Sequence, residues 1–310
     1  MIKDYGAIPL VSICTTTFNH EKYLSECLDG LLMQQTSFPF EILVHEDAST
    51  DNTAKILREY EQNYPHIIRC VYQTENQFLK QNTLINILFR MARGKYVALC
   101  EGDDYWTDPL KLQKQVDFLE QHPDYVLCSA DARIENLTSQ LFRAIYTHFD
   151  RDMSFNQAQV LTDFYCPTLS MVFRNNVMLI PDWFHNVKSG DSFLHYLLSR
   201  HGKFYFMNFI AGVYRQHNAG ISNTNNKISW FENNLEHLEK LRTYVDKESV
   251  LALKEQIYKN QLEYIESLKA AGQWRKALAV YFRMEKLPFA IRRKYLKQVS
   301  VSFARAVLRK

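Results

Sequence analysis

The chain has 310 residues, of which 46% are hydrophobic and 23% are charged. This is the composition of a globular protein with a core large enough for one big domain or two. A formal net charge of +3 is too small to indicate a nucleic-acid-binding protein. We expect no membrane span and no export, because no run approaches 18 apolar residues and the N-terminus lacks a basic-then-apolar leader. Six scattered cysteines without CxxC spacing are typical of a reducing cytoplasm.

The first hundred residues predict alternating strands and helices. Apolar or β-rich runs indicate strands, and apolar residues at helical spacing indicate the helices between them. The strands are expected at 11–15, 40–44, 67–72 and 96–100. The helices are expected at 22–34, around Ile56, Leu57 and Tyr60, and at 84–91. Asp51 is a natural N-cap for the second helix. The alternation predicts an α/β protein with a doubly wound, mostly parallel, Rossmann-like sheet and right-handed crossovers.

Polar stretches follow three of these strands. They occupy residues 15–19, 45–51 and 101–106. Because the carboxyl ends of parallel strands form one edge of a sheet, we expect the three stretches to lie together along one rim. Ligands bind in the crevice at such a rim in open α/β sheets.

The third stretch carries three carboxylates within four residues, namely Glu101, Asp103 and Asp104. Such a cluster repels itself unless a positive charge lies there, and its oxygens suit a hard cation such as Mg²⁺ or Mn²⁺. An acidic turn, followed by Asp108-Pro109 capping the next helix, is the alternative that these residues alone leave open.

Two common nucleotide-binding loops are missing from the sequence. There is no GxGxxG after the first strand and no GxxxxGK followed by Ser or Thr, which argues against a dinucleotide oxidoreductase and a P-loop ATPase. A nucleotidyltransferase would bring a glycine-rich, Lys/Arg-bearing loop after the first strand, and residues 15–19 do not provide one. Metal and side chains would therefore have to hold the phosphates of any bound nucleotide.

Between residues 109 and 184 the expected elements are less regular. We predict a helix that begins at Asp108-Pro109 and ends at His122-Pro123, and strands over 125–130 and 168–173. The intervening segment 133–165 is expected to be irregular, with helical hints at 155–164, and residues 181–184 are expected to form a turn.

Three blocks of the sequence resemble the inverting family 2 glycosyltransferases, in that family's order. They are VSICTTTFNH at 11–20, EDASTDNT at 46–53 and RGKY through EGDD at 93–104, which match VSVIIPTYN, DDGSTDNT and GEYI…LDSDD. The similarity continues through 167–174, 190–194 and 214–222. The resemblance implies a GT-A domain over 1–222, with a nucleotide-sugar-binding half at about 9–130 and an acceptor half at 131–222. A C-terminal α-helical region would follow at 223–310.

The resemblance also implies roles for residues on the donor side. Thr16, Phe18 and Asp47 occupy the positions that hold a uracil base, and Asn19 joins them as a nucleotide-sugar-binding residue. Asp103 and Asp104 match the DxD-type pair that meets ribose and metal. The sequence departs from the family pattern at three positions, where it has Thr16 for proline, Glu46 for the first aspartate of DDGS and Glu101 for the first of DSDD.

Three residues of the acceptor half have both a structural and a catalytic interpretation. By position alone Asp191 is an N-cap or first-turn acid of a helix, whereas the resemblance implies that it is the general base. His217 and Arg215 end an apolar run, where such residues are usually structural. Beside a metal and a diphosphate they become candidates for the third metal ligand and a phosphate clamp.

The chain changes character beyond residue 223. Long amphipathic helices are expected, and Gly272 followed by residues 274–278 indicates one helix-turn-helix unit. The final segment 291–310 has apolar residues every four positions and seven basic residues without an acid. This pattern fits a helix that lies on anionic lipid, and it fits equally a helix packed on the enzyme with solvated charges.

The combined prediction is a metal-dependent inverting glycosyltransferase with Mn²⁺ or Mg²⁺ as cofactor. Its donor is expected to be a UDP-sugar, and its acceptor a saccharide or lipid-linked saccharide of surface polysaccharide or glycolipid biosynthesis. The expected location is the cytoplasm, at the inner face of the membrane. The rival interpretation is a nucleotide-sugar-binding or scaffold protein without transferase activity.

Overall fold

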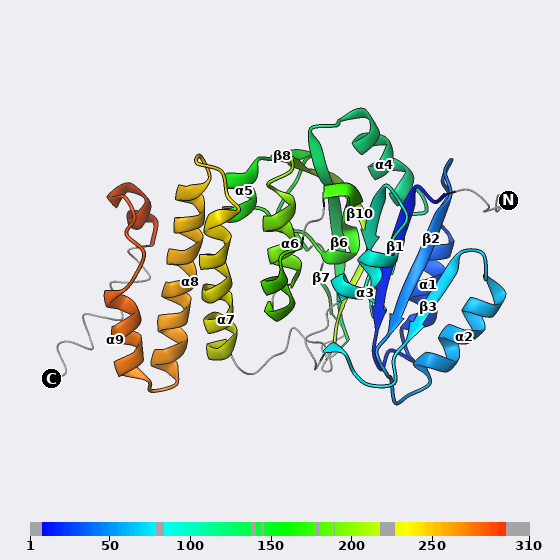
Figure 1. Cartoon of the computed structure of the whole chain (residues 1–310), viewed down its shortest axis with the longest axis horizontal. Helices are drawn as coiled ribbons and strands as arrows, with labels where there is room; N and C mark the ends of the chain where they lie inside the picture. The colour runs from blue at the N-terminus through cyan, green and yellow to red at the C-terminus, as the bar shows by residue number, and fades with distance from the viewer. Residues whose placement is uncertain are drawn as a thin grey trace. The chain divides into compact units, whose positions relative to one another are not determined.

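A computed structural model of the chain describes residues 8–78, 84–137, 141–143, 146–177, 180–188, 190–217 and 227–295. The chain forms two compact units (Figure 1). The sheet unit contains residues 1–155, 165–180 and 201–220, and the helical unit contains 156–164, 181–200 and 221–310. Both units therefore combine segments that are distant in sequence. The domain boundary at residue 222 stays a prediction.

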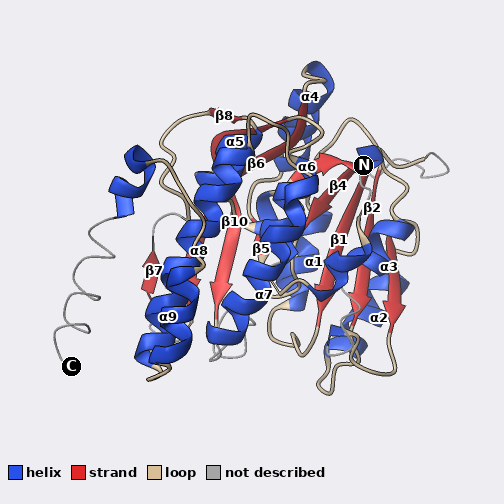
Figure 2. Ribbon diagram, turned by 60° about the vertical axis from the view of Figure 1, so that its left-hand side comes forward, coloured by secondary structure: helices blue, strands red, loops and turns tan. Residues whose placement is uncertain are grey.

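The sheet unit is built on strands that run side by side (Figure 2). Their order is β3-β2-β1-β4-β9-β6-β10-β5, with β7 on β6 and β8 on β10. The long ladders between β1, β2, β3 and β4 and between β6 and β10 are parallel, whereas β5, β7, β8 and β9 pair antiparallel. The bounds are β1 Val11–Thr17, β2 Phe40–Glu46, β3 Ile68–Tyr72, β4 Tyr96–Leu99, β5 Tyr105–Trp106, β6 Tyr125–Asn136, β7 Leu141–Arg143, β8 Met153–Phe155, β9 Val172–Arg174 and β10 Lys203–Gln216. The predicted mostly parallel α/β sheet is confirmed.

Four helices of this unit connect the strands and pack on the sheet. They are α1 Leu24–Leu32, α2 Thr53–Asn63, α3 Leu84–Met91 and α4 Lys111–Gln121. β2 is buried at every position, which is typical of a parallel strand covered on both faces. The core beneath the helices is formed by fully buried residues such as Ile13, Leu28, Ile42 and Val116. All four helices match the predicted pattern.

The segment between residues 125 and 186 differs from the prediction. β6 continues to Asn136, six residues beyond the expected end. The strand expected over 168–173 begins only at Val172, because the Ser170 amide and hydroxyl both donate to the Pro167 carbonyl and close a 3₁₀ turn over Thr168–Ser170. Residues 182–186 likewise form a 3₁₀ helix rather than a simple turn. The helical hint near residue 155 is confirmed by α5, Gln157–Thr162.

The helical unit contains α5 together with longer helices from the C-terminal part of the chain. They are α6 Gly190–Leu198, α7 Lys227–Lys240, α8 Val250–Ala270 and α9 Trp274–Phe282. Gly272 turns the chain between α8 and α9 with a φ of 73°, a conformation that glycine adopts without strain. None of the described helices is both long and apolar enough to cross a membrane. Residues 218–222, the end of the last block that resembles the family, and residues 296–310 of the basic segment lie outside the described residues.

Candidate functional site

The carboxyl ends of β1, β2 and β4 bring the three polar stretches together. These strands are parallel and in direct register. The Asp47 amide donates to the Thr17 carbonyl at 3.0 Å, and the Gly102 amide donates to the Thr16 carbonyl at 2.8 Å. The hydrogen bonds continue the ladders past the strand ends and hold the loops against one another. The prediction that the three stretches share one rim is confirmed.

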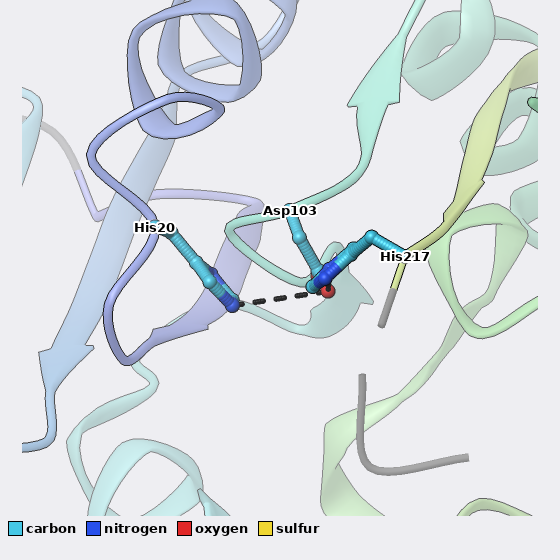
Figure 3. Close-up of side chains that lie close together, drawn as sticks. All are labelled: His20, Asp103 and His217. Atoms are coloured by element: carbon cyan, nitrogen blue, oxygen red, sulfur yellow. Dashed lines mark hydrogen bonds and ion pairs between the residues drawn. The ribbon is translucent and has the colours of Figure 1, made fainter. Parts of the chain in front are cut away.

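Two histidines and one aspartate meet at this rim (Figure 3). His20 follows β1, Asp103 follows β4, and His217 follows β10. Asp103 Oδ2 lies 3.0 Å from His217 Nε2 and 3.8 Å from His20 Nε2. One donor atom from each residue lies within 4.8 Å of the others, which is close enough for all three to bind one ion. The structure thus brings together the predicted ligands Asp103 and His217, and it adds His20.

The electrostatics of this group suit a metal. Burial alone would raise the pKa of Asp103, but the hydrogen bond with His217 and the charge of His20 outweigh it and hold the pKa below its usual range. Burial lowers the pKa of His20, although Asp103 partly offsets the effect. At neutral pH the carboxylate is therefore ionised and the His20 imidazole is neutral. These are the protonation states that bind divalent cations.

Gly102 allows the β1 and β4 loops to approach closely. A Cβ at this position would lie 2.9 Å from Thr17 Cβ and 3.0 Å from His20 Nδ1. Any side chain would therefore force Thr17 or His20 to shift. The Nδ1 atom of His20 is buried and has no hydrogen-bond partner among the described residues.

Asp104, the second aspartate of the predicted metal pair, is not part of this group. Its side chain is buried, and Oδ1 accepts a hydrogen bond from the Arg215 amide at 2.8 Å. Burial raises its pKa well above the usual value, and the nearby charges of Glu101 and Asp103 raise it further. Asp104 therefore connects the loop after β4 to β10. Metal ligation by Asp104 stays a prediction.

The guanidinium of Arg215 is also engaged by the protein. Its nitrogens donate to the Asp103 carbonyl at 3.0 Å, to Glu135 at 3.3 Å and to Glu26. The guanidinium carbon lies 4.2 Å from the centroid of the Tyr105 ring, a cation–π distance. Arg215 is buried and fixes the loop that carries Asp103. Its role as a phosphate clamp stays a prediction.

The residues expected to hold the base lie on the same rim. Thr16 and Phe18 are at the end of β1, and the Phe18 ring is 41% exposed. Asp47 is buried, and its two carboxylate oxygens accept from the Gln77 and Phe78 amides at 2.6 and 3.1 Å. Asp47 therefore anchors the loop after β3. The role of Thr16, Phe18 and Asp47 in holding a base stays a prediction.

Asn19 links the loops after β1 and β2. Its side-chain oxygen accepts from the Thr50 amide at 2.8 Å, and its own amide donates to the Ser49 hydroxyl at 3.0 Å. Asn19 and Ala48 both have a positive φ, near 55° and 59°. Asparagine adopts this conformation readily, whereas alanine is strained there. Strain of this kind is concentrated at functional sites.

Comparison with known proteins assigns the chain to a family. A family model described as glycosyl transferase family 2 matches residues 12–178, more than half of the chain. The chain belongs to glycosyl transferase family 2. The match covers the loops that carry Thr16, Asp47 and Asp103, and it ends before β10 and His217.

Sequence relatives of this family 2 member include bacterial proteins. An uncharacterised protein of Mycobacterium tuberculosis is 36% identical over 214 residues, which are 68% of this chain and 60% of the relative. The putative glycosyltransferase EpsE of Bacillus subtilis is 34% identical over 117 residues, 38% of this chain and 41% of the relative. The chain thus spans less than two thirds of the length of these relatives.

Two solved structures share the fold of this family 2 member. TarS of S. aureus, residues 1–349 in complex with UDP-GlcNAc, has a TM-score of 0.63 and 16% identity over 89% of this chain and 81% of that chain. The mannosyltransferase PcManGT of Pyrobaculum calidifontis, with GDP-Man and Mn²⁺, has a TM-score of 0.57 and 18% identity over 96% and 86%. At these identities the likeness shows the GT-A fold alone.

Asp191 of this family 2 member lies in the helical unit, in the first turn of α6. Its side chain is exposed, and Oδ1 accepts from the Ser192 amide at 2.8 Å. This contact satisfies one of the amides at the helix start. The role of Asp191 as general base stays a prediction.

Sequence reasoning did not find His20 or Glu26. In the sequence His20 only ends the block at 11–20 that resembles the family, and Glu26 only falls within the helix predicted at 22–34. One signal could have identified His20, because it follows β1 and the acidic stretch follows β4, and these strands are adjacent in a parallel sheet. Glu26 gave no comparable signal, since its partner Arg215 is 189 residues away.

Proposed function

We propose that the chain is an inverting glycosyltransferase that moves a sugar from a nucleotide diphosphate donor, a UDP-sugar, to a hydroxyl acceptor. The observation that carries the proposal is the meeting of His20, Asp103 and His217 on the rim that also holds Phe18 and Asp47. A cation site beside an exposed aromatic ring suits a ligand with a base at one end and a diphosphate at the other. Family membership supports sugar transfer as the reaction.

The donor side follows from the residues on the rim. Phe18 offers an exposed ring for stacking with the base, and Thr16 and Asn19 flank it. The base would lie against the loop that the Asp47 carboxylate anchors. TarS, whose structure holds UDP-GlcNAc, and PcManGT, whose structure holds GDP-Man and Mn²⁺, have the same fold.

His20, Asp103 and His217 are the residues that would hold a divalent cation. Bound there, such a cation would neutralise charge on the leaving diphosphate. Imidazole nitrogens are softer ligands than Mg²⁺ prefers, so two histidines with one carboxylate favour Mn²⁺. Arg215 and Asp104 position the loop that presents Asp103. In this proposal His20 takes the place that the sequence gave to Asp104.

On the acceptor side, the Asp191 carboxylate would take the proton from the acceptor hydroxyl as its oxygen attacks the anomeric carbon. General base catalysis of this kind supplies about 10²–10⁴-fold in rate. A single displacement inverts the anomeric configuration. The acceptor would be a saccharide or a lipid-linked saccharide at the cytoplasmic face of the membrane. In support, one relative is named a putative teichuronic acid biosynthesis glycosyltransferase of Bacillus subtilis.

Thermal shift followed by a transfer assay tests the proposal. UDP-sugars are expected to raise the melting temperature with Mn²⁺ present and to do so much less with EDTA, because a ligand that binds only the folded state stabilises it. UDP release in the presence of an acceptor extract would then show turnover. A melting shift without donor hydrolysis or transfer would favour the binding or scaffold protein, and no shift with any nucleotide sugar would contradict both.

Asp191→Asn tests the general base. Turnover is expected to fall at least 100-fold while the Mn²⁺-dependent melting shift by the donor is unchanged. Asp182→Asn is the matched control, because Asp182 is also an exposed first-turn acid of the helical unit. Equal turnover of the two variants would remove Asp191 from the mechanism.

A further inference from the structure

The chain is strongly polarised in charge. Residues 274–310 contain eleven Lys and Arg and a single acid, Glu285, which gives a net charge of +10. The whole chain has a net charge of +3, so the preceding 273 residues carry −7. Asymmetry of this size suggests that the C-terminal part meets an anionic partner that the rest of the chain does not.

The outer face of α9 presents a row of large apolar side chains. Trp274, Leu278 and Phe282 are spaced four residues apart and are 46%, 40% and 80% exposed. The inner face of α9 packs through the buried Ala277 into a cluster with residues of α7 and α8 (Figure 2). The row is therefore not required for the packing of the helical unit. Phe289, which is 67% exposed, follows it in the chain.

Exposed cations lie within and directly after this apolar row in the sequence. Arg275, Arg283, Lys286, Arg292 and Arg293 are exposed, and they form no ion pair with any carboxylate in the described part of the chain. Neighbouring Lys276 and Lys294 are paired with Glu232 and Glu255, so carboxylates are available nearby. The unpaired cations do not serve the packing of the unit.

We propose that this surface, defined as the outer face of α9 with residues 283–295, docks on a membrane rich in anionic lipids. Aromatic and aliphatic side chains enter the boundary between headgroups and acyl chains, and Arg and Lys beside them contact lipid phosphates. A nucleic acid would explain the cations and an exposed aromatic ring, but not the exposed aliphatic side chain of Leu278 in the same row. The proposal extends the basic segment predicted at 291–310 to α9, and it does not depend on the sugar-transfer reaction.

Vesicle co-sedimentation of the full chain tests the proposal. The protein is expected to bind vesicles of 30% phosphatidylglycerol in phosphatidylcholine and not to bind vesicles of pure phosphatidylcholine. Binding to the phosphatidylglycerol vesicles should fall at least tenfold at 0.5 M NaCl, because salt screens the contacts with lipid phosphates. Failure to bind phosphatidylglycerol vesicles at low salt would overturn the proposal. Equal binding to both vesicle types would overturn its electrostatic part.

Matched variants locate the surface. Leu278→Gln and Phe282→Gln are each expected to weaken vesicle binding at least fivefold. Leu110→Gln, at an equally exposed leucine of the sheet unit, is expected to have no effect. Arg283→Gln should weaken binding and Lys55→Gln, at an exposed lysine of α2, should not. Donor-induced melting shifts should be unchanged in all of them.

A different outcome would assign the surface to a second copy of the chain. Sedimentation velocity would then show a dimer that Phe282→Gln dissociates, without vesicle binding by the native chain. Equal vesicle binding by Leu278→Gln and Leu110→Gln would also contradict the proposal, because it would place the contact elsewhere.

Discussion

The sheet unit has buried carboxylates at both of its rims, and the two rims differ in how far neighbouring groups compensate the negative charge. At the amino ends of the strands, Glu41 accepts hydrogen bonds from Ser12 and from the amide and guanidinium of Arg93, with Arg69 at 3.5 Å. Burial alone would raise the pKa of Glu41, but these partners outweigh it and lower the pKa. Every oxygen of this carboxylate is satisfied by the protein.

The carboxyl-end rim holds more negative charge than it neutralises. Glu101, Asp103 and Asp104 lie together, and the guanidinium of Arg215 is shared with Glu26 and Glu135. As a result Asp103 and Asp104, adjacent in sequence, have pKa values shifted in opposite directions. A buried carboxylate whose oxygens are all hydrogen-bonded, such as Glu41, stabilises the fold. Excess negative charge beside two imidazoles indicates instead a binding site for a cation.

Asp103→Asn is expected to have the largest effect, on metal binding. Removing the only carboxylate of the His20, Asp103 and His217 group should weaken Mn²⁺ binding at least 100-fold, about 2.8 kcal/mol. Isothermal titration calorimetry of the native chain and the variant measures the change. Glu41→Gln, the same substitution at the other rim, should leave Mn²⁺ affinity unchanged. Equal Mn²⁺ affinity of Asp103→Asn and the native chain would place the cation elsewhere.

Glu41→Gln is expected to reduce stability instead, by about 2 kcal/mol at pH 7, because a charge-assisted bond to Arg93 is lost. A carboxyl group with a lowered folded pKa stabilises the protein above its unfolded pKa, and this contribution disappears as pH falls through the folded pKa. The difference between native chain and variant in urea unfolding should therefore shrink below about pH 4. A difference that stays constant down to pH 3 would contradict this account.

Lys111 is a buried lysine of α4 that takes part in neither carboxylate group. Its ammonium lies 4.0 Å from the Trp106 ring centroid and has no hydrogen-bond partner among the described residues. Burial lowers its pKa to about 7. Between this value and the unfolded value of 10.5 the unfolded chain binds more protons, so stability rises with pH, by up to about 1.4 kcal/mol per unit.

Lys111→Met should remove this slope and stabilise the protein by roughly 1–2 kcal/mol at pH 7, because a buried ammonium without a hydrogen-bond partner is replaced by an apolar chain of similar length. Urea unfolding between pH 6 and 9 measures both effects. Lys114→Met is the control on the same helix, where the lysine is partly exposed and paired with Asp108. A stability loss in Lys111→Met alone would show that the ammonium has a favourable role.

Asp104→Asn is expected to have the smallest effect. Asparagine keeps an oxygen for the Arg215 amide, so Mn²⁺ affinity should fall at most tenfold, about 1.4 kcal/mol, through the loss of a nearby charge. Calorimetry alongside Asp103→Asn gives the comparison. If the two variants lose the same affinity, Asp104 is a direct ligand, as the sequence predicted.

The sequence was sufficient for the parts of the site that depend on local pattern. Apolar runs located β1, β2 and β4, and parallel topology then placed their loops on one rim. The partners of Arg215 could not be predicted, because they depend on the register of β10 against β6 across two irregularities. The late start of β9 depends on one hydrogen-bonded turn at Pro167. The pattern of apolar residues cannot predict such a turn.

The three donors of the candidate cation site lie far apart along the polypeptide, at positions 20, 103 and 217. During synthesis the ribosome releases His20 and Asp103 long before β10 and His217 emerge. A nascent chain can therefore pair its first strands without being able to chelate metal at this group. Binding of a metal ion by all three residues would therefore become possible only once β10 has joined the sheet.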